Sequence, residues 1–503
     1  MTSYKYISLI GMGAYGAVYL IETGDNDDKE YVAGKYLFNT ENEGVMNPQE
    51  IAIFASFDHP NLCHGISLKN EIEEFRNRPP PGRENMVADS GFALTVWLPY
   101  ATRSNLADYL NYNTISVEAK IDIMYQIMCG IEFLHHVNIL HLDIKPANIL
   151  VYDDPNNKVS GVCVKLTDFG SCCYTTFTKT RYFKNEIVTI NVRPPENFSG
   201  CCYSQSTDVW SAGIVFFEIA NQLSVYSSFE EDYIKSANKS LFNDRNHRNS
   251  IDGLFKQEKV PPGHIRDNLI DLLDKMMRYN SADRIKPDEI LKHPLFAGKV
   301  KPTGTVLNSP TCIPNFDDID VNCFIAIHRI IIYGTQCKVR TETVFLAITL
   351  FWRIYGRDNE NKKQEDYSYK LTSVACFWLA YKMIEPEHLM VDNLQELSNL
   401  DKSEIIHREN TIILHLNGVL YPWNLYNYCY NKPTCIKAFT DIINPKIYYT
   451  LDIRLWLENN TVASQVEIDR PFTEFFNNTE WSKILENDNG TALSEHFYNE
   501  FLD

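Results

Sequence analysis

Apolar and polar positions follow different periods along the chain, and the change separates a mixed first part from a helical second part. Residues 6–9 and 18–21 have the composition of short β-strands. Apolar residues recur at helical spacing over 121–135, which predicts a helix with one face in a core. Beyond about residue 320 helical periodicity returns in separate blocks: 324–333, 341–355, 367–384, 403–416 and 423–429. The pattern predicts an α+β region followed by an all-α region.

A basic, proline-rich stretch interrupts the strand pattern between two further expected strands, 63–68 and 92–97. It contains Arg76, Arg78 and Arg83 around a run of prolines. Such a segment predicts a solvated surface loop, and the alternative is a loop that docks a partner.

Composition narrows the class of protein. A length of 503 residues predicts two or three domains, and a hydrophobic content of 44% is sufficient for their cores. The net charge of −18 argues against a nucleic-acid or anionic-membrane surface, which requires the opposite sign. Thirteen scattered cysteines lack zinc-type pairs, no apolar leader opens the chain, and the apolar stretch 344–351 is too short to span a bilayer. We expect a soluble intracellular protein that is not secreted and binds neither nucleic acid nor membrane.

Two motifs in the middle of the α+β region carry the chemistry of phosphoryl transfer. This reaction needs a carboxylate to receive a hydroxyl proton, a cation beside the transferred phosphate and oxygen ligands for Mg²⁺. The run 141–148, His-Leu-Asp-Ile-Lys-Pro-Ala-Asn, offers Asp143 as the base, Lys145 for the phosphate and Asn148 for the metal. Asp168, in Asp-Phe-Gly, offers a second metal ligand. With these signatures the chain resembles eukaryotic-type protein kinases.

Further landmarks of that family follow in the family's order. A strand-flanked glycine segment would cover the phosphates of ATP with Ile10, Gly11, Met12, Gly13, Ala14, Tyr15, Gly16, Ala17 and Val18. Lys35 matches the lysine of the third strand, with Gly34 in place of the usual aliphatic residue, and Glu50 matches its ion-pair partner. Backbone groups of Pro99 and Ala101 would hold the adenine.

The resemblance implies a bilobal, α+β protein kinase fold over residues 4–296, with an N-lobe over about 4–98 and a C-lobe over about 102–296. ATP and Mg²⁺ are the implied cofactors. Glu196 and Arg284 match a buried structural pair, and Asp208 matches the start of a buried helix that anchors the C-lobe.

The segment before Glu196 resembles that of cyclin-dependent kinases. Lys145 and Thr189 match the serine/threonine type, which implies protein substrates phosphorylated on Ser or Thr. Arg193 matches the arginine that favours proline after the phosphoacceptor. Asn191 and Val192 replace the two aromatic residues that usually precede this arginine, so proline-directed specificity stays open.

The helical second part resembles a cyclin box. We expect a linker over 297–319, a cyclin-box-like domain over 320–430, and a second degenerate repeat or a tail over 431–503. Segments 338–347, 373–382 and 405–416 resemble the second, third and fifth helices of cyclins, and Lys382 and Glu409 match the pair that contacts the kinase. A generic helical extension is the alternative. A fused kinase and cyclin box also resembles proteins of large DNA viruses, for which a host cytoplasm or nucleus would be the location.

Two functions from different classes fit these motifs. One is an active serine/threonine kinase with its own cyclin-like activator, and the other is a pseudokinase scaffold. The catalytic groups Lys35, Glu50, Asp143, Asn148 and Asp168 are all present, which favours the enzyme.

The residues that related kinases use for regulation by phosphorylation are only partly present. In related kinases three arginines bind an activating phosphothreonine; the matching positions hold Gln49, Leu142 and Cys173, and Lys184 stands at the acceptor position. Rival acceptors in the same loop are Thr175, Thr176, Thr178 and Thr180. Tyr15 matches an inhibitory phosphorylation site, and an aromatic residue that only shields the site is the alternative.

Overall fold

The structure is a computed structural model of the chain. It describes residues 4–13, 16–24, 29–40, 44–45, 47–77, 92–175, 180–182, 188–198, 200, 202–242, 247–307, 321–358, 366–385 and 391–421. The chain divides into two units, Met1–Trp423 and Asn424–Asp503. The helix expected over 423–429 and the repeat or tail expected over 431–503 lie outside the described residues.

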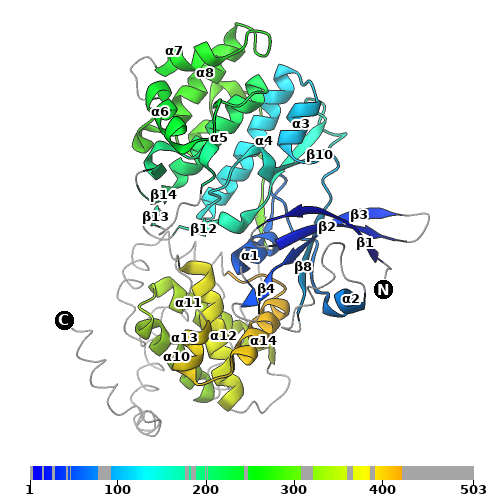
Figure 1. The fold of residues 1–503 in the computed structure, drawn as a ribbon, viewed down its shortest axis with the longest axis vertical. Helices are drawn as coiled ribbons and strands as arrows, with labels where there is room; N and C mark the ends of the chain where they lie inside the picture. Colours follow the sequence, from blue (N-terminus) through cyan, green and yellow to red (C-terminus); the bar gives the residue numbers. More distant parts are fainter. Residues whose placement is uncertain are drawn as a thin grey trace, which may run out of the picture. The chain divides into compact units, whose positions relative to one another are not determined.

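An antiparallel five-stranded sheet forms the first part of the fold, with strand order β1-β2-β3-β8-β7 (Figure 1). Its strands are β1 (Tyr4–Met12), β2 (Gly16–Thr23), β3 (Glu30–Leu37), β7 (Ser67–Asn70) and β8 (Leu94–Pro99). The short strands β4 (Asn39–Thr40), β5 (Gly44–Val45) and β6 (Phe57–Asp58) flank helix α1 (Pro48–Ser56). Strand β7 begins later than the expected 63–68 because Cys63 donates its backbone N–H to the carbonyl of Leu166 in the C-lobe.

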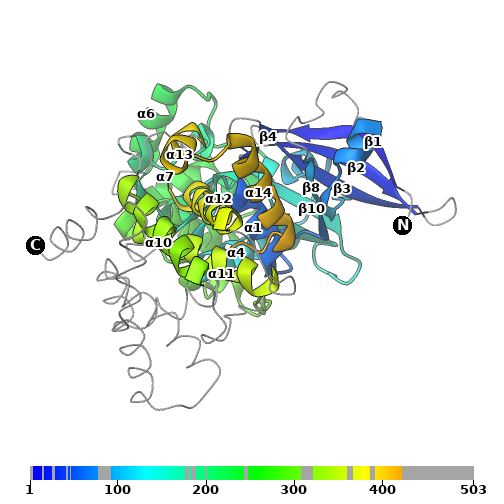
Figure 2. The ribbon, with the colours of Figure 1, turned by 90° about the horizontal axis from the view of Figure 1, so that it is seen from below.

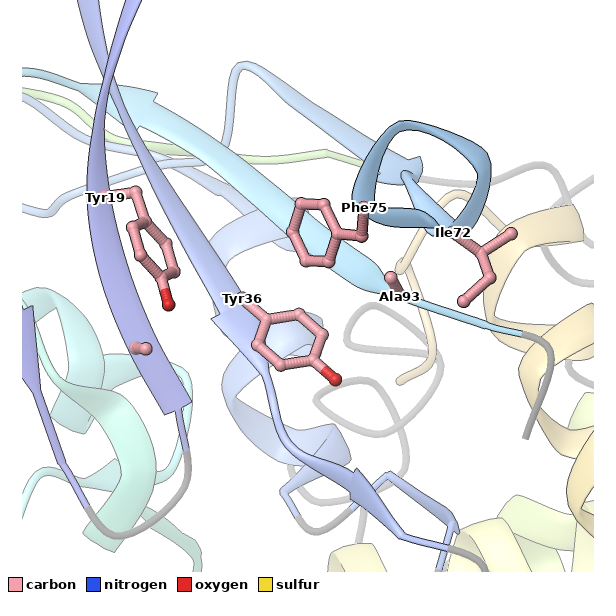
Figure 3. Packing of buried hydrophobic residues seen from close by; sticks show 6 residues of the cluster. Tyr19, Tyr36, Ile72, Phe75 and Ala93 are labelled. Carbon is pink, nitrogen blue, oxygen red and sulfur yellow. The ribbon is translucent and has the colours of Figure 1, made fainter. Parts of the chain in front are cut away.

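A packed helix leads into the basic insertion, whose first two residues, Arg76 and Asn77, are exposed as expected but form the end of this helix rather than a loop. Helix α2 (Ile72–Asn77) lies on the sheet face that carries Tyr19 and Tyr36 (Figure 3), and its Ile72 and Phe75 are buried. The Phe75 ring meets those of Tyr6 and Tyr36 edge to face at centroid distances of 5.3 and 5.4 Å. This aromatic cluster gives the sheet a second covered face. Residues 78–91 lie outside the described part of the chain.

Gly34 lies against the side chains of this second face. A Cβ at Gly34 would lie 2.4 Å from Cδ1 of Ile21, so the aliphatic residue usual in the family would force the end of that side chain to move. We expect Gly34→Ala to lower the free energy of unfolding by about 1–3 kcal/mol, the usual cost of overpacking. Urea unfolding measures this change. Adding Ile21→Val, which removes the obstructing methyl group, should recover part of the loss; a single variant as stable as the parent would contradict the packing argument.

The C-lobe is mainly helical and is built around the buried helix α5 (Gln205–Asn221). Its other helices are α3 (Leu106–Tyr112), α4 (Val117–His136), α6 (Glu231–Phe242), α7 (His247–Leu254), α8 (His264–Met276) and α9 (Pro287–Ile290). Short strands and 3₁₀ turns carry the loops between them: β9 (Ile139–Leu140), η1 (Pro146–Asn148), β10 (Ile149–Asp153), β11 (Val162–Leu166), η2 (Phe169–Ser171), β12 (Cys173–Tyr174), β13 (Thr180–Tyr182), η3 (Ile190–Val192), η4 (Pro195–Phe198), β14 (Cys202–Ser204), η5 (Ser281–Asp283) and η6 (Pro294–Phe296). The α4 stripe predicted over 121–135 is buried, as expected of a core helix.

The second part is helical, which confirms the expected fold class. Its described helices are α10 (Val321–Gln336), α11 (Thr341–Asp358), α12 (Asp366–Ile384), α13 (Val391–Ser398) and α14 (Lys402–His415). Helix α12 is central, because it packs against α10, α11 and α14, and its residues from Val374 to Ala380 are buried. The short helix α13 was not predicted from the periodicity.

The segment expected to be a plain linker contains ordered structure. Strand β15 (Thr305–Val306) pairs antiparallel with β6, directly after α1. Every cysteine in the described ranges is a free thiol. No helix within those ranges has the length and apolarity needed to cross a membrane.

Candidate active site

A buried carboxylate of α5 holds the loop that carries Asp143. Asp208, near the start of α5, accepts the backbone N–H groups of His141 and Leu142 at 2.8 and 2.9 Å and pairs with His135 Nε2 at 2.8 Å. Leu142 has a φ of 62°, an uncommon backbone conformation for a branched residue. Bonds from α5 therefore set the conformation of the chain just before Asp143.

Asp143 lies at the centre of a polar cluster. Its Oδ1 accepts the hydroxyl of Thr189 at 2.5 Å, and its Oδ2 accepts Lys145 Nζ at 2.8 Å and Asn148 Nδ2 at 2.7 Å. Lys145 Nζ also donates to the Thr189 hydroxyl at 3.1 Å. The arrangement brings a carboxylate, a cation and a hydroxyl from three parts of the sequence to one point.

Lys35 connects the sheet, α1 and the Asp-Phe-Gly segment. Its Nζ lies 2.5 Å from Oε1 of Glu50, which confirms the expected ion pair, and 3.5 Å from Oδ1 of Asp168. Burial alone would lower the pKa of Lys35, but these two carboxylates outweigh it and hold the pKa above its ordinary value. Lys35 is therefore a fixed cation at neutral pH.

The Asp-Phe-Gly segment is packed against α1. Phe169 is fully buried and lies between the rings of Phe54 and His141, at centroid distances of 5.2 and 5.6 Å. Asn47, which precedes α1, donates its side-chain amide to the carbonyl of Gly170 at 2.8 Å. Moving α1 would therefore disturb Asp168 as well as Glu50.

The glycine segment forms the turn from β1 to β2. A Cβ at Gly16 would meet the carbonyl of Tyr36 at 2.4 Å, so the fold itself requires that glycine, whereas a Cβ at Gly13 would meet no atom within 4 Å. Val18 pairs with Lys35 across the strands and shares its face. Ala17 packs into the aromatic cluster on the opposite face, so only its backbone could face a nucleotide.

The residues expected to contact ATP differ in their surroundings, and two of them lie outside the described part of the chain. Gly11 lies in β1, and Ile10 and Met12 beside it are exposed. Ala14 and Tyr15 lie outside the described residues, so the Tyr15 switch stays a prediction. At the end of β8 the carbonyl of Pro99 accepts the Tyr152 hydroxyl at 3.2 Å, and Ala101 follows the strand.

The predicted structural pair is present. Arg284 donates two bonds to the Glu196 carboxylate, at 2.6 and 2.7 Å, in a bidentate geometry. Arg193, two residues before Pro195, is buried and donates Nε to the carbonyl of Val188 at 3.0 Å. These bonds hold both ends of the segment that carries Thr189.

The helical second part contacts the kinase at the segment before α1 (Figures 1 and 2). Lys382 of α12 donates to the carbonyl of Val45 at 2.9 Å and is ion-paired with Glu409 of α14. Both charged side chains are buried, and Lys382 Nζ also lies 3.9 Å from the centre of the Trp378 ring. The predicted pair is thus placed against β5, three residues before α1.

Two further contacts of this part were missed by sequence reasoning. The rings of Tyr174 and Tyr421 stack at 4.4 Å with an interplanar angle of 10°. Phe92, two residues before β8, meets His407 of α14 at 5.0 Å. Neither pair has a local sequence signal, because its members come from parts of the chain more than 200 residues apart.

Comparisons with known proteins agree with this geometry. The model of the protein kinase domain matches residues 4–296, and the model of the cyclin N-terminal domain matches residues 311–421. A probable cell division protein kinase of Encephalitozoon cuniculi is 28% identical over 295 residues, which cover 58% of this chain and 97% of that protein. Mitogen-activated protein kinase 4a of Physcomitrium patens is 27% identical over 311 residues, 57% of this chain and 75% of that protein.

Neither of these relatives is viral, and the comparisons give no support to the viral resemblance. The kinase model spans more than half of the chain, and the helical second part has a family match of its own. The chain therefore belongs to the protein kinase family, with a kinase domain fused to a cyclin domain.

Proposed function

We propose that the chain is an ATP- and Mg²⁺-dependent serine/threonine protein kinase that its own cyclin domain activates. The observation that carries this proposal is the contact of Lys35 with both Glu50 and Asp168, since it joins the sheet, α1 and the metal-ligand segment in one arrangement. A scaffold that never transfers phosphate would not need these three groups together.

The roles of the side chains follow from their positions. Asp143 accepts the proton of the substrate hydroxyl while the hydroxyl oxygen bonds to the γ-phosphorus of ATP. The bond between that phosphorus and the β,γ-bridging oxygen breaks, and ADP leaves with the electron pair. Lys145, 2.8 Å from Asp143, balances negative charge on the transferred group, and Lys35 orients the remaining phosphates.

The residues present fit a bound Mg²⁺. Asn148 uses its N–H groups on Asp143, which leaves Oδ1 available, and the Asp168 side chain is 46% exposed. The described residues hold no cluster of three or more His, Cys, Asp or Glu side chains of the kind that binds a metal. Mg²⁺ does not need such a cluster, because it is commonly held by one or two protein oxygens together with substrate phosphates. When bound, it neutralises charge on the phosphate oxygens.

Proline-directed specificity is supported by the bond from Arg193 to the Val188 carbonyl. Val188 precedes Thr189, which touches Asp143, so the substrate residue after the phosphoacceptor would pass close by. The N–H of that residue would have to share the Val188 carbonyl with Arg193. Proline has no N–H and therefore loses nothing.

Activation by the cyclin domain is supported by the burial of the Lys382–Glu409 pair against β5. A Cβ at Gly418, after α14, would lie 2.8 Å from Cγ2 of Ile51, so the same domain also packs closely on α1. These contacts would hold Glu50 against Lys35. Because the two domains share one chain, the effective concentration of the activator is of millimolar order for a short flexible connection.

A peptide-library assay on the purified full-length chain tests this function. We expect Mg·ATP-dependent phosphate incorporation into Ser and Thr peptides, enriched for Pro after the acceptor, and none when EDTA removes Mg²⁺. Incorporation into Tyr peptides alone would contradict the serine/threonine assignment. ATP binding without any transfer would favour the pseudokinase.

A further inference from the structure

Residues 297–307, which we call the strap, follow the kinase domain directly in the sequence. They were expected to be a linker, yet they are bonded to the kinase along their length. Lys299 Nζ lies 2.5 Å from Oδ1 of Asp122, and Lys301 is ion-paired with Glu132. Both carboxylates belong to α4, so the first half of the strap is fixed to a core helix of the C-lobe.

The middle of the strap passes directly over aromatic rings. A Cβ at Gly304 would lie 2.4 Å from Cε2 of Phe133 and 2.7 Å from Cδ2 of His59. The Phe133 ring contacts His59 at 4.8 Å and Phe57 at 5.7 Å. Only glycine allows the backbone to lie this close to the junction between α4 and the end of α1.

The last part of the strap completes the C-terminal end of α1. Thr305 and Val306 pair with Asp58 and Phe57, and Leu307 donates its backbone N–H to the carbonyl of Ser56 at 2.7 Å. Ser56 is the last residue of α1 and is fully buried. Carbonyls in the last turn of a helix have no hydrogen-bond partner within the helix. Water does not reach the buried Ser56 carbonyl, so the N–H of Leu307 supplies its partner.

We propose that the strap is a positioning element for α1, and therefore for Glu50, rather than a passive tether. The Lys382–Glu409 pair holds the segment before α1, and the strap holds the other end of the helix. The cyclin domain holds α1 at the segment before it and at Ile51, and the strap adds a hold on its C-terminal end. This inference rests on the proposed activation by the cyclin domain, and it adds that activation needs the docked strap as well as the docked domain.

Leu307→Pro in the full-length chain tests the strap, with Leu307→Ala as the matched control. Leu307 is 45% exposed, so the loss of its side chain should matter little, whereas Pro removes the N–H that the Ser56 carbonyl accepts. The preceding residue is already in a strand, the conformation that proline favours there. Leaving a buried carbonyl unpaired should lower kcat roughly five- to 100-fold. The KM for the peptide should not change.

Hydrogen exchange distinguishes positioning from general instability. In the Pro variant, amides in the last turn of α1 and in β6 should exchange faster, while those of α5 and α8 should exchange at the parental rate. Gly304→Ala disturbs the strap at a different point. It should likewise lower kcat and speed exchange in the last turn of α1 and in β6. Gly253→Ala is its control, since a Cβ there meets no atom within 4 Å.

The outcomes separate the two proposals. If Leu307→Pro and Gly304→Ala match their controls in kcat and in exchange, the strap is only a tether and the inference fails. If those variants match their controls while disruption of the Lys382–Glu409 pair removes activity, the activation proposal alone survives. If neither disturbance changes kcat, activation by the cyclin domain fails as well.

Discussion

Asp143→Asn should lower kcat by roughly 10²- to 10⁴-fold, the usual contribution of a general base, and should leave the fold intact. An amide in this position can direct its oxygen toward Lys145 and Asn148 and its N–H₂ toward the Thr189 hydroxyl oxygen, so no contact of the cluster must break. What it cannot do is accept the hydroxyl proton. Steady-state kinetics at saturating Mg·ATP measure the loss.

A matched control is Asp153→Asn, which makes the same chemical change in an exposed ion pair with Arg103. Exposed pairs contribute about 0–1 kcal/mol, so kcat and the melting temperature should both stay near the parental values. ATP affinity should be retained in both variants. Parental turnover in Asp143→Asn would show that Asp143 is not the base.

The second large effect concerns the buried pair between the two domains. Lys382→Ala would leave the Glu409 carboxylate buried without its cation and would remove the bond to the Val45 carbonyl. Burial raises the pKa of Glu409, and Lys382 offsets part of that rise. Removing one member of a buried pair typically costs about 3–5 kcal/mol. We expect at least a tenfold fall in kcat, equivalent to about 1.4 kcal/mol, because undocking is one way to relieve the stranded charge.

Lys382→Met combined with Glu409→Gln separates docking from charge burial. The double variant keeps volume and removes the charges, so the cyclin domain should remain folded while the bond from Lys382 to the Val45 carbonyl is lost. Lys402→Ala is a control in the same domain, because its partner Asp392 is largely exposed. A double variant with parental kcat would contradict activation through this pair.

Activity should also persist after phosphatase treatment. Leu142, where related kinases carry an arginine, is buried, and Cys173 and Gln49 carry no charge. Thr175 is buried with its hydroxyl bonded to the Asn138 carbonyl at 3.0 Å, which makes it a poor acceptor in this conformation. Lys184, Thr176 and Thr178 lie outside the described residues. Loss of the kinase activity of the full-length protein after dephosphorylation would show that loop phosphorylation is required.

Local patterns were sufficient for the family and for the candidate catalytic groups. Asp143, Lys145 and Asn148 lie within six residues of one another, and a motif this short keeps its geometry whenever its loop forms. The family resemblance also identified two pairs whose members are distant in sequence, Lys35 with Glu50 and Lys382 with Glu409. The apolar blocks also indicated most helices of the second part, among them the largely apolar α12, whereas the eight-residue α13 was missed.

The surroundings of the site were decided by tertiary structure. The helix that follows β7 packs on the sheet because Phe75 finds Tyr6 and Tyr36 on strands far away in sequence. Gly304 looked like a linker glycine, and only the position of Phe133 explains why it cannot be another residue. Sequence alone thus determined which residues carry the proposed chemistry, because that information is local or shared with the family. Which segments hold α1 in place depends on long-range contacts with no period or spacing, so only the folded chain could decide it.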